Sequence, residues 1–151
     1  MEQGIRINKY LSGAGYCSRR EADRLVGEGR VRIGGMTADV GSRVMPGEEV
    51  YVDEKKIVPE EETVLLAVNK PRGIVCTATD KQGSNNIVDF IGYNKRIYPV
   101  GRLDKDSEGL LFMTNDGEMM NKILKGKNGH EKEYIVEVNR ELDGDFEKKM
   151  S

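Results

Sequence analysis

The stretch PVGRLDKDSEGLLFMT occupies residues 99–114 and joins two features that seldom adjoin. Between Gly101 and Gly109 it carries three acidic and two basic residues, and an apolar run follows at once. Charge of this density is costly beside a core, because charged groups lose their hydration when they are buried. The pattern therefore predicts a functional charged loop that leads directly into a strand over residues 110–114.

Length and composition allow one ordinary domain or two small ones, since the chain has 151 residues. Lys and Arg number 24 against 26 Asp and Glu, so the net charge does not indicate nucleic-acid binding. The distribution of charge along the chain does indicate it, because residues 5–35 carry seven basic and three acidic residues. Residues 48–62 carry seven acidic and two basic residues. A basic module is thus followed by an acidic connector.

The chain lacks signals for export, membrane insertion or disulfide formation. Cys17 and Cys76 are far apart and have no metal-ligand neighbours, which predicts reduced thiols. The N-terminus has no apolar stretch typical of a signal peptide, and no apolar run approaches the length of a membrane span. These features predict a soluble, cytoplasmic protein with no membrane partner.

Local patterns in the first third predict two short helices and a small sheet. The order Ser18-Arg19-Arg20-Glu21 has the form of a capping box. The pair Gly34-Gly35 is a hairpin turn signal between two alternating runs. The expected elements are a helix over 6–11, a capped helix from 18 to 27, and strands over 30–33, 36–38 and 50–52.

The rest of the chain predicts a second domain over residues 64–151, after a first domain over 1–53. Residues 54–63 are polar, acidic and contain Pro59, so we interpret them as a linker. The expected elements are a buried strand over 64–68, a turn at 69–73, a short helix capped by Ser84 and ending at Ile91, a strand over 110–114, a helix over 117–124, a strand over 132–138 and a helix from Asp145.

Several motifs together resemble one known family. The pattern G-R-L-D-x-D-S-x-G-L over 101–110 resembles the catalytic motif of the pseudouridine synthases, particularly those that modify ribosomal RNA and carry an N-terminal S4 domain. The turn N-K-P-x-G over 69–73 resembles the first motif of the same family. The first third resembles the S4 RNA-binding domain at Leu11, Gly15, Ser18, Arg19, Ala22, Gly29, Val31 and Gly35.

The resemblance implies an α+β fold: a small S4-like α/β RNA-binding domain followed by part of a mixed, mainly antiparallel-sheet catalytic domain. It also implies an isomerase that converts a uridine of ribosomal RNA, expected in the large-subunit 23S RNA, to pseudouridine. This reaction breaks the bond from uracil nitrogen to ribose and remakes it to carbon, so no cofactor is expected. The partner implied is ribosomal RNA.

The resemblance assigns Asp104 as the catalytic nucleophile, which attacks either the base or the sugar. The opposite charges of Arg102 and Lys105 are expected to favour the ionised carboxylate. Arg102 lies two residues before Asp104, so in an extended segment both side chains share a face. The resemblance places Arg102 in the gap left by the flipped base, although a phosphate contact would explain it equally. A solvated surface aspartate is the plainer alternative.

The K-x-Y match over residues 132–134 implies that Tyr134 packs against the uracil. Alternation with Val136 and Val138 predicts a strand with this ring on its core side. A core tyrosine without a catalytic role is the alternative.

Calcium is a competing interpretation of the charged loop. EF-hand positions 1, 3, 5 and 6 fall on Asp104, Asp106, Glu108 and Gly109. Position 12 is Asn115, which cannot supply a bidentate carboxylate, and Pro99 precludes the entering helix. We therefore expect no metal site.

Basic residues of the first domain predict contacts to RNA phosphates. Arg20 and Arg24 are four residues apart and share a helix face. The alternative is a solvated face on which Glu21 and Asp23 balance these charges. The residues expected to bind RNA are Lys9, Arg19, Arg20, Arg24, Arg30 and Arg32.

The resemblance also implies a further family motif beyond the Tyr134 strand, and nothing after Arg140 supplies it. The sequence thus reads as C-terminally truncated, and we expect the 151-residue chain to be inactive alone. Exposed apolar surface on an incomplete catalytic domain is expected to favour self-association. A non-catalytic S4-type RNA-binding module is the alternative function.

Overall fold

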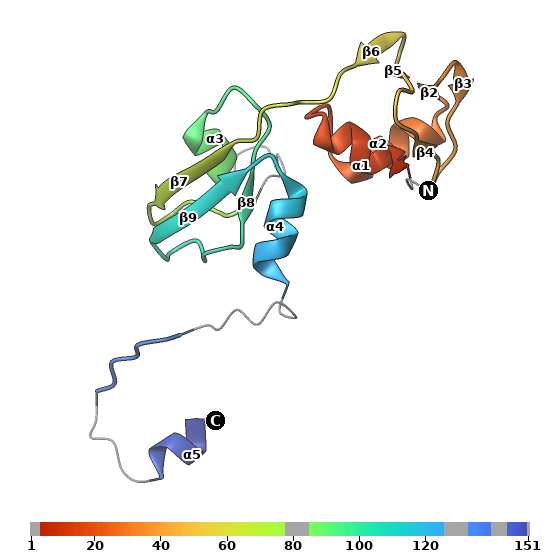
Figure 1. Ribbon diagram of the computed structural model, residues 1–151. Coiled ribbons are helices and arrows are strands. Elements are labelled where there is room, and N and C mark those ends of the chain that lie inside the picture. Colours follow the sequence, from red (N-terminus) through yellow and green to blue (C-terminus); the bar gives the residue numbers. More distant parts are fainter. Residues whose placement is uncertain (1–3, 78–84, 126–132, 140–144, 151) are drawn as a thin grey trace.

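The computed structural model describes residues 4–77, 85–125, 133–139 and 145–150. Within these ranges the chain forms an α+β fold with two separate hydrophobic cores, and all strand pairs of its three sheets are antiparallel. Figure 1 shows the two units joined by a single extended connection. In the described ranges no helix is long and apolar enough to cross a membrane.

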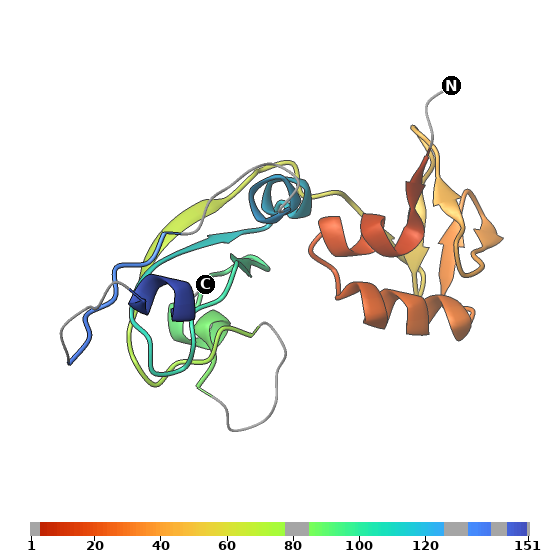
Figure 2. The same cartoon turned by 90° about the horizontal axis from the view of Figure 1, so that it is seen from below.

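The first unit begins with the two expected helices, α1 (Ile7–Gly13) and α2 (Arg19–Gly27). Ser18 caps α2, because its hydroxyl oxygen accepts a hydrogen bond from the Glu21 backbone N–H at 3.2 Å. Figure 2 shows the two helices side by side on one face of the small sheet. Their buried residues are Ile7, Leu11, Ala22, Leu25 and Val26.

Six short strands complete this unit. The four-stranded sheet has the order β3-β2-β5-β6, and β1 pairs with β4. Gly34 and Gly35 have φ angles of +54° and +90°, which glycine adopts without steric cost, so the predicted hairpin is confirmed. The strands are β1 (Ile5–Arg6), β2 (Val31–Ile33), β3 (Met36–Thr37), β4 (Arg43–Val44), β5 (Val50–Val52) and β6 (Lys55–Ile57).

Strand β6 corrects the expected start of the linker. It pairs with β5, and Ile57 is buried in the first core. Asp53 and Glu54 form the turn between the strands, with φ angles of +47° and +66°. The acidic composition of 54–63 concealed a hairpin, because its single buried side chain gives too short an apolar pattern to recognise.

The second unit has a three-stranded sheet of order β7-β9-β8, formed by β7 (Leu65–Lys70), β8 (Tyr98–Val100) and β9 (Gly109–Thr114). Helix α3 (Ile87–Ile91) packs its Ile87 against Leu111 and Met113 of the sheet. Helix α4 (Gly117–Leu124) follows β9 directly, as predicted. Asn86 caps α3, not Ser84, which lies outside the described residues.

Strand β7 is buried on one face only, whereas the apolar run over 64–68 predicted a buried strand. Leu66 and Val68 pack against the second core, but Leu65 is 51% exposed. On the same open face Leu110 and Phe112 of β9 are 64% and 39% exposed. This apolar strip, together with the exposed Ala67, stays uncovered because α3 packs on the opposite face.

The predicted strand over 132–138 is wrong for the six residues that the structure describes. Residues 133–138 are irregular, and Tyr134, Ile135 and Val136 are 78%, 96% and 67% exposed. Figure 1 shows this segment running away from the sheet toward α5 (Phe146–Met150). Alternation predicts a strand only where a neighbouring strand accepts its backbone hydrogen bonds, and the described residues offer none here.

Candidate functional site

The charged loop connects β8 to β9 between two glycines that adopt left-handed backbone angles. Gly101 has a φ angle of +85° and Gly109 one of +134°, values that other residues reach only with strain. The loop closes on itself through a hydrogen bond from the Ser107 N–H to the Asp104 carbonyl, at 3.1 Å. Backbone geometry therefore explains both glycines of the motif.

A buried lysine holds this loop from beneath. The Lys70 side chain is fully buried, and its Nζ donates to the carbonyl oxygens of Pro71, Lys105 and Ser107 at 3.0, 3.1 and 2.6 Å. These contacts satisfy all three ammonium protons. The Gly73 N–H also donates to the Lys105 carbonyl, at 2.8 Å. The end of β7 thus fixes the loop on the C-terminal side of Asp104.

The N-terminal side of Asp104 is anchored independently. The Leu103 N–H donates to Cys76 Sγ at 3.4 Å, and the Leu103 side chain packs against the second core. Cys76 is a buried free thiol, so this hydrogen bond holds the Leu103 backbone against the second core. Both neighbours of Asp104 are therefore held by residues 70–76.

Sequence reasoning missed Lys70 as a site residue and treated it only as part of a turn. A signal was present, since Leu66, Val68 and Lys70 alternate on the buried face of β7. A lysine at the third buried position of a strand implies an acceptor cage. The identity of those acceptors, however, depends on a loop more than thirty residues away.

The side chains of Asp104 and Arg102 are exposed on this anchored loop. Within the described residues, neither Arg102 nor Lys105 forms an ion pair with Asp104, so the expected local charge pairing is absent there. The ion pair of the loop joins Glu108 to Arg72, at 3.3 Å, and both partners are largely exposed. The carboxylate of Asp104 is therefore presented to solvent from a fixed backbone.

Tyr134 is not brought to this site in the structure. It lies in the exposed segment 133–139, which leads away from the sheet (Figure 1). Lys132 of the K-x-Y match lies outside the described residues.

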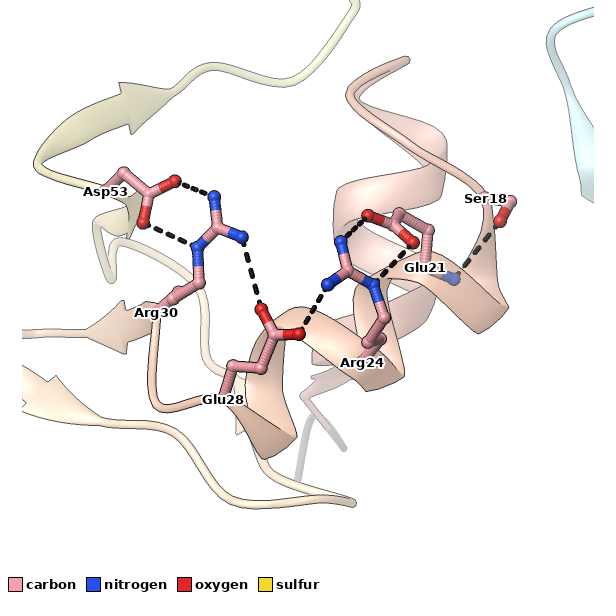
Figure 3. Close-up of polar contacts among 6 residues, drawn as sticks. All are labelled: Ser18, Glu21, Arg24, Glu28, Arg30 and Asp53. Atoms are coloured by element: carbon pink, nitrogen blue, oxygen red, sulfur yellow. Dashed lines mark hydrogen bonds and ion pairs between the residues drawn. The ribbon is translucent and has the colours of Figure 1, made fainter.

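Most of the expected RNA-binding residues are already paired with acidic residues. Figure 3 shows a chain of contacts in which Arg24 joins Glu21 to Glu28 and Arg30 joins Glu28 to Asp53. The hydrogen bond from Arg24 lowers the pKa of Glu21, and that from Arg30 lowers the pKa of Asp53. In the structure Arg24 is thus paired with Glu21, as the balanced-face alternative expected, and also with Glu28.

The two remaining paired cations contact acids at other places. Arg32 donates to Glu54 at 2.5 Å and stacks over the Tyr51 ring, 5.8 Å from its centroid. Lys9 donates to Glu118 of α4 at 2.5 Å. Arg19 and Arg20, by contrast, are exposed and have no ion-pair partner among the described residues.

Four cations gather at one surface pocket of about 350 Å³ on the first unit. They are Arg6, Lys9, Arg19 and Arg43. The β1–β4 pairing places Arg6 directly opposite Arg43. Sequence reasoning missed Arg43, because it lies outside the basic segment and reaches the pocket only through this pairing. We call these four residues the basic pocket.

Comparisons with known proteins agree with both units. Residues 64–151 match the family described as RNA pseudouridylate synthase, and residues 5–50 match the S4 domain. The dual-specificity RNA pseudouridine synthase RluF of Escherichia coli (strain K12) is 49% identical over 152 residues, which are 99% of this chain and 52% of that protein. The ribosomal large subunit pseudouridine synthase B of Bacillus subtilis (strain 168) is 39% identical, over 88% of this chain and 55% of that protein.

A solved crystal structure of a pseudouridylate synthase is also similar, at 27% identity. It covers 82% of this chain and 54% of its own, with a TM-score of 0.45. The chain thus spans about half the length of the curated relatives it matches.

Proposed function

Because this chain belongs to the RNA pseudouridylate synthase family, we propose that it acts in isomerising a uridine of ribosomal RNA to pseudouridine. The observation that carries the proposal is the anchoring of the Asp104 loop. Lys70, Gly73 and Cys76 hold the backbone on both sides of Asp104, while its side chain remains open to an incoming nucleotide. An exposed charged loop without a function has no need of a buried ammonium beneath it.

In this proposal Asp104 is the nucleophile that attacks the target nucleotide. The hydrogen bonds to Leu103, Lys105 and Ser107 preset its position, and misplacement by about 1 Å can cost on the order of a hundredfold in rate. Arg102 lies two residues away and is likewise exposed. It therefore either fills the gap left by the flipped uridine or contacts a phosphate of the same RNA.

Tyr134 is proposed to pack against the uracil, on the basis of the K-x-Y match alone. This role requires the segment 133–138 to lie against the sheet of the second unit. The exposed side chains of Tyr134 and Ile135 would become buried in that arrangement.

We propose that the first unit binds the RNA backbone through the basic pocket together with Arg20. Arg19 and Arg20 are the best placed, since no described acid competes for them. Arg24, Arg30 and Arg32 must first leave a carboxylate partner, so their contribution is smaller than the sequence predicts. Phosphate contacts of this kind bind structured RNA without reading its bases.

The binding test compares two double variants of equal charge change. Arg19→Gln with Arg20→Gln should weaken affinity for a ribosomal RNA fragment and reduce the slope of log K against log salt by about 1.5. Arg30→Gln with Arg32→Gln should have a smaller effect on both quantities. Unchanged affinity and slope in the first double variant would contradict the proposed RNA surface.

The catalytic test uses complementation of cells that lack the encoding gene. Restoring the gene with Asp104→Asn should leave the target uridine unmodified, whereas Asp106→Asn in the same loop should restore the modification. RNA binding by the purified Asp104→Asn protein should persist. If the Asp104→Asn gene also restores pseudouridine, Asp104 is not the nucleophile.

A second candidate function is an RNA-binding module that does not catalyse. The exposure of Tyr134, in an irregular segment that leads away from the sheet (Figure 1), favours it. The same complementation separates the two, because a module binds RNA yet adds no pseudouridine in cells that carry the unaltered gene. In either case we place the protein in the cytoplasm, where ribosomal RNA is found.

We also propose that the chain self-associates through the apolar strip of Leu65, Ala67, Leu110 and Phe112. The register pairs Ala67 with Phe112, so these side chains adjoin on one open face. Leu110→Lys should reduce the associated fraction in sedimentation velocity. Val40→Lys, at a 72% exposed position of the first unit, should not. Equal effects of the two would exclude the strip as the contact.

A further inference from the structure

Two cations of the basic pocket also face a second pocket, where the two units meet. This junction pocket, of about 280 Å³, is lined by Lys9 and Arg19 from the first unit. Its acidic lining comes from the connection and from the start of α4. The acids are Glu60, Glu62, Asp116 and Glu118. The same two cations therefore border both the proposed RNA surface and a pocket that carries four carboxylates.

Among the residues that the structure describes, one ion pair joins the two units, between Lys9 Nζ and Glu118 Oε1 at 2.5 Å. The pair lowers the pKa of Glu118, so the carboxylate is ionised near neutral pH. The two side chains are still 42% and 66% exposed, so solvent and other ions can reach them. Arg96 also contacts the first unit, donating to Ser12 Oγ at 3.3 Å.

Both partners of this ion pair stand on rigid elements. Lys9 projects from α1, which is anchored in the first core by Ile7 and Leu11. Glu118 lies in the first turn of α4, where the Asp116 side chain accepts its backbone N–H at 2.8 Å. The pair therefore contributes, together with the Arg96–Ser12 hydrogen bond, to holding the first unit against the second.

We propose that the Lys9–Glu118 pair is a clasp that RNA opens, with a phosphate replacing the carboxylate as the partner of Lys9. This inference rests on the proposed RNA-binding function. Glu118 competes with RNA in two ways, since it occupies Lys9 and repels phosphates that approach the basic pocket. Release of the pair lets the units reorient about residues 58–59, because Lys95 and Asn115 hold residues 60–64 on the second unit. The free protein is thus held in an arrangement that binds RNA more weakly.

The test is a double-mutant cycle on RNA affinity, measured by fluorescence anisotropy with a ribosomal RNA fragment at low salt. Glu118→Gln keeps the side-chain shape and should tighten binding by about two- to fivefold, the range expected for an exposed ion pair. In a Lys9→Met background the same substitution should have a markedly smaller effect. Glu61→Gln is the matched control, because Glu61 is exposed and makes no ion pair in the described ranges.

The outcomes separate this inference from the function on which it rests. If the unaltered chain binds no RNA, the proposed function fails. Suppose instead that the unaltered chain binds RNA. If Glu118→Gln then changes the RNA affinity no more than Glu61→Gln does, or changes it equally in the presence and absence of Lys9, only the clasp is overturned.

Small-angle X-ray scattering without RNA adds an independent arm. Glu118→Gln should increase the radius of gyration at low salt, and high salt should bring the unaltered chain to the same value. Identical scattering of the two proteins at low salt would also overturn the clasp.

Discussion

Replacement of Lys70 by methionine tests whether the buried ammonium holds the loop that carries Asp104. Methionine keeps the length and apolar stem of the side chain but removes three hydrogen bonds to carbonyl oxygens. The Lys105 carbonyl retains the Gly73 N–H as a donor. The described residues provide no other donor to the carbonyls of Pro71 and Ser107, which are left unsatisfied.

The expected cost follows from those two orphaned acceptors. A buried polar group without a partner costs about 1–3 kcal/mol, so the two acceptors in Lys70→Met should lower the free energy of unfolding of the second unit by about 2–6 kcal/mol. Since small domains have a total of about 5–15 kcal/mol, this is a large fraction. Lys105→Met is the control, because that side chain is exposed in the same loop and should change stability by less than about 0.5 kcal/mol.

Hydrogen exchange measured by mass spectrometry in increasing urea resolves the two units separately. Peptides from β7, β9 and the loop should lose protection in Lys70→Met, while peptides from α1 and α2 should not change. Equal protection in Lys70→Met and Lys105→Met would refute the reasoning, since the ammonium would then contribute nothing beyond an exposed lysine.

Three further predictions concern local contacts. Ser18→Ala should lower the urea stability of the first unit by about 1 kcal/mol, whereas Ser18→Asn, which also caps, should stay near the unaltered value. Arg30 lowers the pKa of Asp53 in the folded protein. The Arg30–Asp53 pair therefore stabilises the fold above the ordinary Asp pKa, and this stabilisation is lost as the pH falls through the lowered pKa of folded Asp53. The difference in Tm between Asp53→Asn and the unaltered chain should therefore shrink on acidification, and a constant difference would exclude the pair as its cause. Cys76→Ala should speed exchange of the Leu103 amide in NMR, while Cys76→Ser should preserve its protection.

Several parts of the fold were predictable because their causes lie within a few residues. The capping box at Ser18 and the paired glycines at 34–35 act through adjacent backbone groups, and both predictions are confirmed. The strand at β9 and the helix at α4 likewise follow from local apolar patterns. The family itself was recognisable from the ordered residues of the charged loop.

Other features depend on groups that meet only in three dimensions. The acceptors of Lys70 come from a loop more than thirty residues away, and Arg43 joins the basic pocket through the register of β1 and β4. Which arginines carry a carboxylate partner depends in the same way on the turn at Asp53.

The segment 133–138 shows the opposite case, in which a clear local pattern did not produce the expected element. Its alternation satisfies every local requirement of a strand, yet the described residues place no strand edge beside it. Local sequence thus determined the elements whose hydrogen bonds close within a few residues. Tertiary structure alone decided the pairings between distant strands, the Lys70 cage and the ion pairs of Lys9, Arg30 and Arg32, because a backbone or ionic group is satisfied only by a partner that the fold brings within hydrogen-bonding distance.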